Sequence, residues 1–350
     1  MLAPTTHVLP FTVVQRQRLL PVVGRVTARK GQKVNPADVV AEANLAAEHL
    51  LLSVARGLGL PPAKANEYIV RKVGDELDAG DVIAGPLGLA KRVVRAPRAG
   101  KVVAVINGQV LLEVASSRYE LRAGLPGTVA SIVAERGVVV ENTGALIQGV
   151  WGNGQMAIGS LHVLMRKPED VLTANMLDVS LRGAVILGGH CREAAVLQSA
   201  AEIPVRGLIL ASMASSLLPA VANVHFPVII LEGFGALPLN SAAFKLLTTT
   251  GRREVAINAE MEPLLGTRPE VFIPLPAGGE LPQPGGTTIF TPNQRVRVLC
   301  NPYRSRIGTL IALLPTWHAF PNGLRAVAAE VRLENDENVV LPLANLEVLD

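Results

Sequence analysis

Two similar stretches in the first third of the chain determine its predicted fold: residues 31–41 read GQKVNPADVVA, and residues 74–84 read GDELDAGDVIA. They share the spacing of a glycine, an aspartate and a β-branched pair, 43 positions apart. In each stretch an aspartate, Asp38 or Asp81, stands directly before the β-branched pair, as a turn residue stands before a strand. We therefore predict an internal repeat in which each copy is a strand, a turn and a second strand.

A third segment completes this pattern. Residues 96–105, APRAGKVVAV, lead into Asn107-Gly108, and Asn-Gly between apolar runs is a strong hairpin signal. Together, the pattern G-x-x-V-x-x-G-D-V-I-A … A-P-x-x-G-x-V resembles the barrel-sandwich hybrid fold over about residues 20–115. The resemblance implies a lipoyl-like domain at residues 1–115, and the alanine- and leucine-rich residues 41–66 are expected to form a helical insertion in it.

In some families this fold carries biotin or a lipoyl group on a lysine at a hairpin tip, and the corresponding residue here is Lys91. Its neighbours read GLAKRV, without the methionines of the biotin pattern or the acidic residue of the lipoyl pattern. Lys91 is also closer to Pro97 than the biotin pattern requires. We therefore expect Lys91 to be an unmodified hairpin lysine, and we expect no cofactor in the chain.

The same hairpin is rich in positive charge and contains no acid. Its five cations are Lys91, Arg92, Arg95, Arg98 and Lys101. They could contact about four phosphates of a polyanion, or they could form a solvated strand face. Residues 1–115 hold 15 basic and 9 acidic residues, so attraction to an acidic partner belongs to this third of the chain. Because only 3% of the residues are aromatic, nucleic-acid binding is expected to be weak and salt-dependent.

The middle of the chain changes from β-rich to alternating strands and helices. Residues 116–170 form a predicted β-rich extension, and residues 171–261 form a predicted small Rossmann-like domain with a parallel sheet. The segments that support this are strands at 184–187, 205–210, 227–231 and 255–258, and helices at 192–203, 212–222 and 241–249.

Ligands of such sheets bind beyond the carboxyl ends of the strands. The ligand-binding candidates are Gly188, Gly189, His190, Cys191, Arg192 and Glu232. If a helix begins near Arg192, its free N–H groups would favour a small anion. The alternatives are that Gly188 and Gly189 form a turn with a purely structural role and that Glu232 is an exposed loop acid. Dinucleotide, P-loop and nucleophile-elbow motifs are missing from the sequence, as is metal-ligand spacing, so no catalytic residue and no metal ligand is assigned.

The end of the chain is predicted to be a separate β domain. Residues 262–293 hold seven prolines and are expected to be a Pro/Gly-rich linker. Short strands and turns follow in residues 294–350 and predict an SH3-like barrel. The run VRVLCNPYRSRIGTL at 296–310 is similar to the KOW motif of ribosomal and transcription-elongation proteins, with Tyr303 where that motif usually has glycine. The resemblance implies contacts with RNA or with protein.

Composition limits the class of protein. The chain has 350 residues, of which 49% are hydrophobic and 18% charged, as in a multi-domain globular protein. Cys191 and Cys300 are too few for a disulfide framework, so a reducing, cytoplasmic location is expected. Residues 207–231 carry no charge, but Pro219 and Pro227 favour a buried strand–helix–strand unit over a membrane span. We therefore expect no membrane insertion.

These patterns predict a multi-domain α/β plus all-β protein with three parts: a barrel-sandwich hybrid, a small Rossmann-like sheet and a C-terminal SH3-like barrel. The leading functional hypothesis is a non-enzymatic scaffold or adaptor with a protein partner and a small anionic ligand. One alternative is a nucleic-acid-, ribosome- or transcription-associated factor that uses the KOW-like barrel. Another is an enzyme with its site at the loops of the Rossmann-like sheet.

Overall fold

The chain is mostly β, with 49% of its residues in strands and 14% in helices. A computed structural model describes residues 2–45, 48–88, 91–114, 118–261, 267–276 and 288–349. The chain divides into two compact units. The first comprises residues 1–19, 28–40 and 122–350, and the second comprises residues 20–27 and 41–121. Residues 1–19 therefore belong with the middle and the end of the chain, although the sequence suggested that they are part of the first predicted domain.

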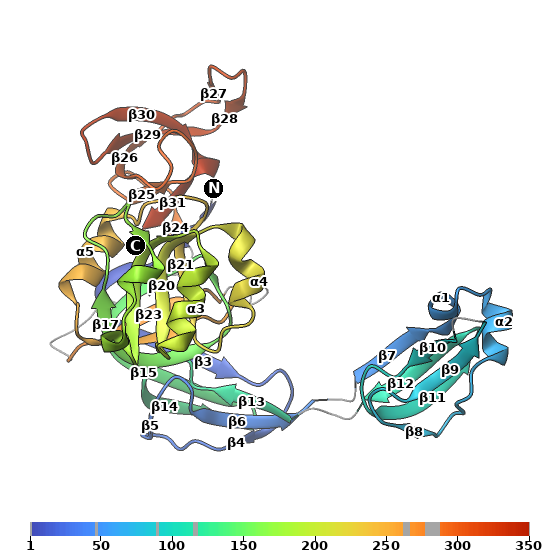
Figure 1. The fold of residues 1–350 in the computed structure, drawn as a ribbon. Coiled ribbons are helices and arrows are strands. Elements are labelled where there is room, and N and C mark those ends of the chain that lie inside the picture. Colours follow the sequence, from blue (N-terminus) through green and yellow to red (C-terminus); the bar gives the residue numbers. More distant parts are fainter. Residues whose placement is uncertain are drawn as a thin grey trace. The chain divides into compact units, whose positions relative to one another are not determined.

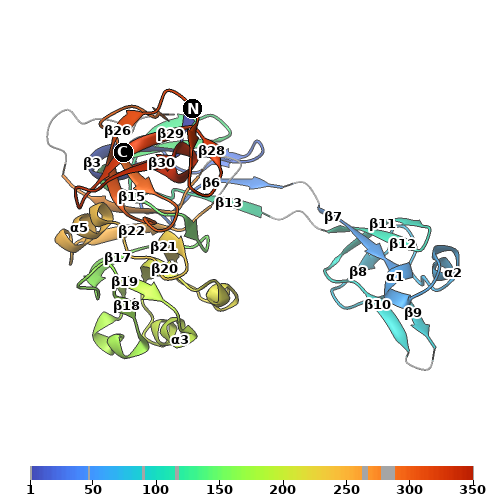
Figure 2. The same ribbon diagram turned by 90° about the horizontal axis from the view of Figure 1, so that it is seen from above.

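The first unit is built on a twelve-stranded sheet (Figures 1 and 2). Its main order is β16-β21-β20-β19-β17-β22-β23-β15-β14-β5, while β18 pairs with β19 and β3 with β15. The strands are β3 (Val8–Leu19), β5 (Lys33–Val34), β14 (Gly127–Val133), β15 (Gly137–Gln148), β16 (Trp151–Gly152), β17 (Met156–Val163), β18 (Val171–Leu172), β19 (Ala184–Cys191), β20 (Gly207–Met213), β21 (Val228–Phe234), β22 (Glu254–Asn258) and β23 (Glu270–Pro274).

The parallel part of this sheet is covered on both faces. Strands β17, β19, β20 and β21 are parallel neighbours. Helices α3 (Ala194–Glu202) and α4 (Leu218–Val221) pack on one face, and α5 (Ser241–Thr249) packs on the other. Two buried apolar clusters, one on each face, hold these helices in place. This explains why β19, β20 and β21 read as continuous apolar runs.

Three details of the predicted alternation of strands and helices in residues 171–261 are wrong. The strand predicted at 255–258 is β22, which runs antiparallel to β17, because an apolar run does not encode strand direction. Residues 188–191 continue β19 instead of forming a turn, since they pair with β18 and β20. Ser212 lies inside β20 and does not cap a helix; α4 begins only at Leu218.

The end of the chain forms a six-stranded sheet, here called the C-terminal sheet, with the order β2-β31-β25-β26-β29-β30. Its strands are β2 (Thr5–Thr6), β25 (Arg295–Val298), β26 (Ile307–Leu313), β29 (Ala328–Leu333), β30 (Asn338–Pro342) and β31 (Leu346–Leu349). Five lie where the sequence predicts short strands, and β2 is an addition from the N-terminus. Among the described strands no sheet closes into a barrel.

Two small pairs complete the first unit. A hairpin of β27 (His318–Ala319) and β28 (Arg325–Ala326) projects from the C-terminal sheet in Figure 1. Strand β1 (Leu2–Ala3) pairs with β24 (Thr288–Ile289).

The predicted Pro/Gly-rich linker at 262–293 contains a central strand. Residues 262–266 and 277–287 lie outside the described part of the chain. Between them, β23 pairs with β15 and β22 and buries Val271, Phe272 and Ile273. The linker prediction is therefore wrong for β23, because the high proline content around it hid a short apolar run that completes a sheet.

The second unit contains three smaller sheets, with the orders β7-β12-β11-β8, β10-β9 and β13-β6-β4. Its elements are β4 (Arg25–Val26), β6 (Val39–Asn44), β7 (Glu48–Ser53), α1 (Val54–Leu58), α2 (Pro62–Glu67), β8 (Glu76–Leu77), β9 (Val82–Leu87), β10 (Arg92–Arg95), β11 (Gly100–Ile106), β12 (Gln109–Val114) and β13 (Arg118–Arg122). The helical insertion predicted at 41–66 is helical only from Val54. Before it, β7 pairs with β12, and this pairing overrides the helix propensity of leucine.

The internal repeat appears in the strand pairing. Val26 pairs with Ala41, and 43 positions later Ile69 pairs with Ala84. Gly127 pairs with Val34 just as Gly100 pairs with Leu77. The turn bonds repeat as well, because the side chain of Asp38 accepts from the backbone of Asn35, and that of Asp81 accepts from Asp78. We call residues 25–44 with 118–133 the outer copy and residues 48–114, which contain the second set of pairs, the inner copy.

Candidate functional site

The carboxyl ends of β19, β20 and β21 carry the polar residues of the parallel sheet. His190 is near the end of β19, Ser212 near the end of β20, and Glu232 near the end of β21. Adjacent parallel strands place these ends at the same edge, which is the usual ligand position of an α/β sheet. This edge is therefore the first place to look for a functional site.

Ser212 and His190 form a close pair whose hydrogen bonds are already satisfied. Ser212 Oγ lies 3.0 Å from His190 Nδ1 and donates to the carbonyl oxygen of Leu237 at 2.8 Å. It also accepts from the Leu237 N–H at 3.1 Å. Burial lowers the pKa of His190, with a smaller contribution from nearby Arg192. Since Ser212 is fully buried and its proton is held by a carbonyl, the pair anchors the loop after β21 and is not arranged as a nucleophile with its base.

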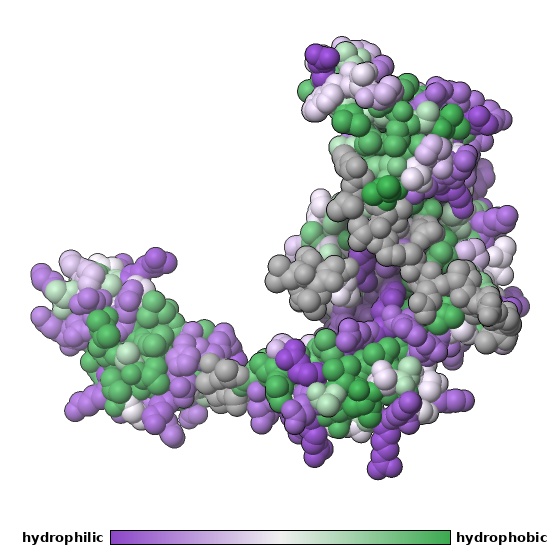
Figure 3. All heavy atoms as spheres, turned by 180° about the vertical axis from the view of Figure 1, so that it is seen from behind, coloured by the Kyte–Doolittle hydropathy of each residue, from purple (hydrophilic) through white to green (hydrophobic). Residues whose placement is uncertain are grey.

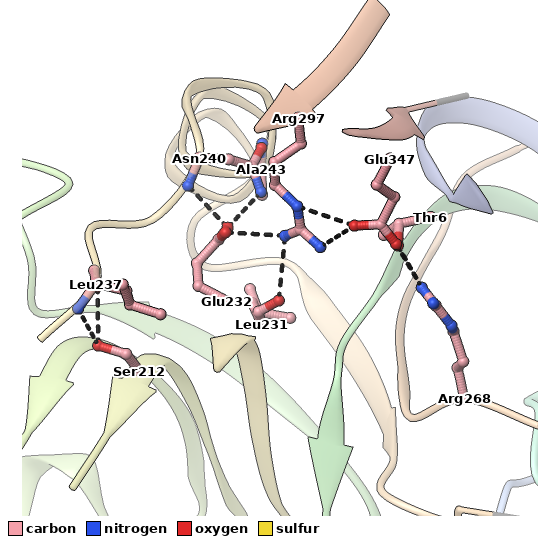
Figure 4. Close-up of polar contacts among 10 residues, drawn as sticks. All are labelled: Thr6, Ser212, Leu231, Glu232, Leu237, Asn240, Ala243, Arg268, Arg297 and Glu347. Carbon is pink, nitrogen blue, oxygen red and sulfur yellow. Dashed lines mark hydrogen bonds and ion pairs between the residues drawn. The ribbon is translucent and has the colours of Figure 1, made fainter. Parts of the chain in front are cut away.

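Glu232 has a buried arginine partner (Figure 4). One oxygen of Glu232 accepts from the backbone N–H of Asn240 at 2.9 Å and from its side-chain amide at 2.6 Å. The other oxygen accepts from Nη1 of Arg297 at 2.8 Å. Asn240 also caps α5, because its side-chain oxygen accepts from the N–H of Ala243. Glu232 is therefore neither the exposed loop acid nor the free ligand contact that the sequence suggested.

Arg297 connects the parallel sheet to the C-terminal sheet. Its Nη2 lies 2.5 Å from Glu347 on β31, and only 3% of its side chain is exposed. Glu347 in turn accepts from Thr6 on β2 and from Arg268 at 3.1 Å (Figure 4). We call Thr6, Glu232, Asn240, Arg268, Arg297 and Glu347 the buried ion network.

Charge compensation explains how this network can be buried. Burial alone would lower the pKa of Arg297, but attraction by Glu232 and Glu347 outweighs it, so the pKa is raised. Burial would raise the pKa of Glu347, but Arg297, Thr6 and Arg268 outweigh it, so that pKa is lowered. Both groups therefore stay charged, with each charge matched by a partner. The network can hold two sheets together, but it offers no free group for acid–base chemistry.

The predicted anion-binding residues have structural contacts instead. A side chain at Gly189 would place its Cβ 1.7 Å from the carbonyl oxygen of Asp170, which also accepts from the N–H of His190. A Cβ at Gly188 would lie 2.7 Å from the side chain of Leu172. Because α3 begins at Ala194, the N–H groups of residues 188–191 are not those of a helix start. The glycines allow β18 and its loop to pack against β19.

Cys191 and Arg192 also differ from their predicted roles. The Cys191 thiol is buried, which raises its pKa to about 11, so it is a protonated core side chain and not an accessible ligand contact. Arg192 is exposed and lies 3.3 Å from its neighbour Glu193. Neither residue therefore supports the predicted anion site.

The five cations of residues 91–101, here called the basic hairpin, do not share one hairpin, because β10 pairs with β9 and β11 pairs with β12 and β8. These cations are also partly neutralised. Arg98 pairs with Glu48 at 2.5 Å, and Lys101 lies across the sheet from Glu76 and Glu113. The Arg95 guanidinium donates to the carbonyl oxygen of Gly80. Lys91 and Arg92 are exposed. Fewer charges are thus available for phosphate than the sequence count suggests.

Sequence reasoning missed Arg297, the partner of Glu232, and Glu347, the second partner of Arg297. Arg297 stands between two apolar residues in a strand reading RVRV, and Glu347 stands inside LEVL. A charge at a core position of a short strand is a usable signal, because such a charge requires a buried partner. What the sequence could not supply was the pairing of Arg297 with two acids that lie 65 and 50 positions away from it.

Comparisons and side-chain clusters add no further assignment. No family model matches the sequence, and no curated protein sequence matches it significantly. Within the described ranges no group of three or more His, Cys, Asp or Glu side chains could hold a metal ion. In the same part of the chain no helix is long and apolar enough to span a membrane.

Proposed function

We propose that the chain is a non-enzymatic, cytoplasmic interaction protein that contacts a protein partner and binds a small anionic ligand. The observation that carries this proposal is the buried position of Arg297 between Glu232 and Glu347. It lies at the carboxyl end of β21, where α/β enzymes hold their substrates. Since these groups satisfy one another, this edge serves to attach the C-terminal sheet.

The finer domain assignments belong to the same proposal. The matched strand pairs of the outer and inner copies support two barrel-sandwich hybrid units, one inserted in the other. The doubly covered parallel strands support a Rossmann-like part. The order of the C-terminal sheet supports an open relative of the SH3-like, KOW-containing barrels. All three occur widely as binding modules, and fold alone assigns no chemistry.

The β27–β28 hairpin is the surface best suited to a protein partner. Trp317 and Leu324 are each 64% exposed, and neither belongs to the buried cluster of the C-terminal sheet. The hairpin is held by two residue pairs and by an edge-to-face contact between His318 and Phe320. Figure 3 shows that the C-terminal sheet also exposes apolar surface bordered by hydrophilic side chains. Exposed tryptophan that stabilises no core is typical of an interface anchor.

A capture experiment tests this function. The tagged full chain, a Trp317→Ser/Leu324→Ser variant and a Val340→Ser control would each be recovered after crosslinking in the native cytoplasm. Val340 is 38% exposed on β30, so the control removes an exposed apolar side chain outside the hairpin. We expect specific proteins to be recovered with the wild type and the control and lost with the double variant. Identical protein profiles for all three would contradict the proposal.

Nucleic-acid binding is the second candidate, and one observation favours it. Residues 294–329 contain five arginines and no acidic residue. However, Arg297 is buried, and the basic hairpin of the second unit is partly neutralised. If RNA rather than protein is lost from the double variant in the same capture experiment, this candidate replaces the first.

A further inference from the structure

A groove in the first unit lies apart from the buried ion network. It is formed by the start of β3, one side of α5, the start of β25 and the turn after β29, and its volume is about 510 Å³. This is the size of a small-molecule site. Its floor and its rim differ in chemistry, and this difference indicates the class of ligand.

The floor is apolar and fixed by the fold. Val8 is buried and pairs with Ile147 across the twelve-stranded sheet, and Pro10 follows it on β3. Leu246 comes from α5 and packs against the core beneath the sheet. Because these side chains belong to a strand and a helix, the floor is preformed and a ligand need not order it.

The rim carries two cationic side chains and one carboxylate that already accepts a hydrogen bond. Lys245 and Arg295 are exposed, and within the described part of the chain neither makes an ion pair or a side-chain hydrogen bond. Glu334, also on the rim, accepts from the Ser241 hydroxyl at 2.7 Å. The rim therefore has an excess of positive charge beside an apolar floor.

We propose that this groove binds a small amphipathic anion. Its apolar body would lie on Val8, Pro10 and Leu246, and its carboxylate or phosphate would lie between Lys245 and Arg295. A purely polar anion would leave the floor uncovered, and an apolar cation would meet two like charges. The inference deepens the ligand-binding part of the proposed function and moves that ligand away from Gly188–Cys191.

The groove is directly connected to the buried ion network. Arg295 is two residues before Arg297 on the same strand, and Ser241 follows Asn240, which binds Glu232. A ligand that contacts both α5 and β25 would therefore bridge the same two parts that the network joins. Its binding should stabilise the first unit in proportion to ligand concentration.

The test uses octanoate with the purified full chain. Acetate has the same charge without the tail, and octylammonium has the same tail with the opposite charge. We expect octanoate alone to raise the melting temperature in a saturable way and to give a measurable dissociation constant by calorimetry. Lys245→Gln and Arg295→Gln should each raise that constant about two- to fivefold, as expected for exposed ion pairs. The double variant should raise it about tenfold, and Arg325→Gln, which removes an exposed arginine outside the groove, should leave it unchanged.

Three outcomes would overturn the inference. One is the lack of octanoate binding, another is equal binding of octylammonium, and the third is an unchanged constant in the Lys245→Gln/Arg295→Gln variant. Ala242→Phe, which fills the groove, provides a second check and should abolish binding. If it unfolds the chain, the exposed charge variants still decide. Because the assay contains only purified chain and octanoate, its result is independent of the partner-capture experiment.

Discussion

Replacing Arg297 with methionine should destabilise the first unit strongly. The substitution keeps most of the apolar stem but leaves Glu232 and Glu347 without the guanidinium that contacts them at 2.8 and 2.5 Å. Their side chains are only 1% and 5% exposed, so water cannot replace the lost partner. Breaking a buried ion pair in this way costs about 3–5 kcal/mol of unfolding free energy. By contrast, Arg306→Met removes an exposed partner of Glu337 at 4.0 Å and should cost less than about 1 kcal/mol.

Urea unfolding followed by tryptophan fluorescence measures this effect. Both tryptophans, Trp151 and Trp317, belong to the first unit, so the signal reports that unit alone. A triple variant that also carries Glu232→Gln and Glu347→Gln removes the unpaired charges and should recover much of the loss. The reasoning is refuted if Arg297→Met costs no more than Arg306→Met, or if the triple variant is no more stable than the single one.

The same variant has a predictable pH dependence. In the wild type the lowered pKa of Glu347 means that its ionised form stabilises the fold above its ordinary pKa, and this contribution is lost as pH falls through the folded-state value. Without Arg297, Glu347 loses the main charge that offsets its burial, so its pKa rises and it takes up a proton at higher pH. The stability difference between wild type and Arg297→Met should therefore shrink between about pH 7 and about pH 5.

Four further predictions concern other parts of the chain. Gly189→Ala should cost about 1–3 kcal/mol in urea unfolding because its Cβ would meet a backbone oxygen, whereas Gly251→Ala, with its nearest atoms at 3.6 Å, should be nearly neutral. In the folded chain a thiol reagent at mildly alkaline pH should label partly exposed Cys300 and spare buried Cys191, whose pKa is about 11; rapid labelling of both would contradict this. The intact mass of the native protein should show no biotin or lipoyl group on Lys91. Any nucleic-acid binding by the basic hairpin should have a log–log salt slope of about −2 to −3, since about three of its cations lack carboxylate partners; tight binding that survives high salt would disprove it.

Local patterns predicted much of the secondary structure. The strands β19, β20 and β21 and the helices α3 and α5 lie close to their predicted positions because their apolar patterns reflect burial on both faces of a sheet. The strands of the C-terminal sheet were found from short apolar runs between turns. Strand β7 was missed because its leucines favour a helix, and only pairing with β12 makes it a strand. Strand β23 was missed because prolines surround it.

The candidate site depended on contacts that no local pattern contains. Glu232 was singled out as an acid in an apolar loop, but its arginine partner lies on β25, 65 positions further along the chain. Gly189 was read as a turn glycine, and its true constraint is the backbone of Asp170. In both cases the sequence correctly marked the residue as unusual. The physical reason was a contact with a residue distant in the sequence, which no local pattern encodes.

The nested repeat gives a physical reason why the chain tolerates its largest insertion. Strands β6 and β13 of the outer copy are neighbours in one sheet, so the chain leaves and re-enters at adjacent strands. The inner copy also begins and ends on paired strands, since Glu48 of β7 lies opposite Val114 of β12. The two connections between the copies therefore join chain ends that are already close together. Making them closes no long loop and costs little conformational entropy. The inner copy also has its own buried cluster, drawn only from residues 50–114, so it does not depend on the outer copy for a core. The inner copy can therefore be placed between β6 and β13 without disturbing the strand pairs of either copy.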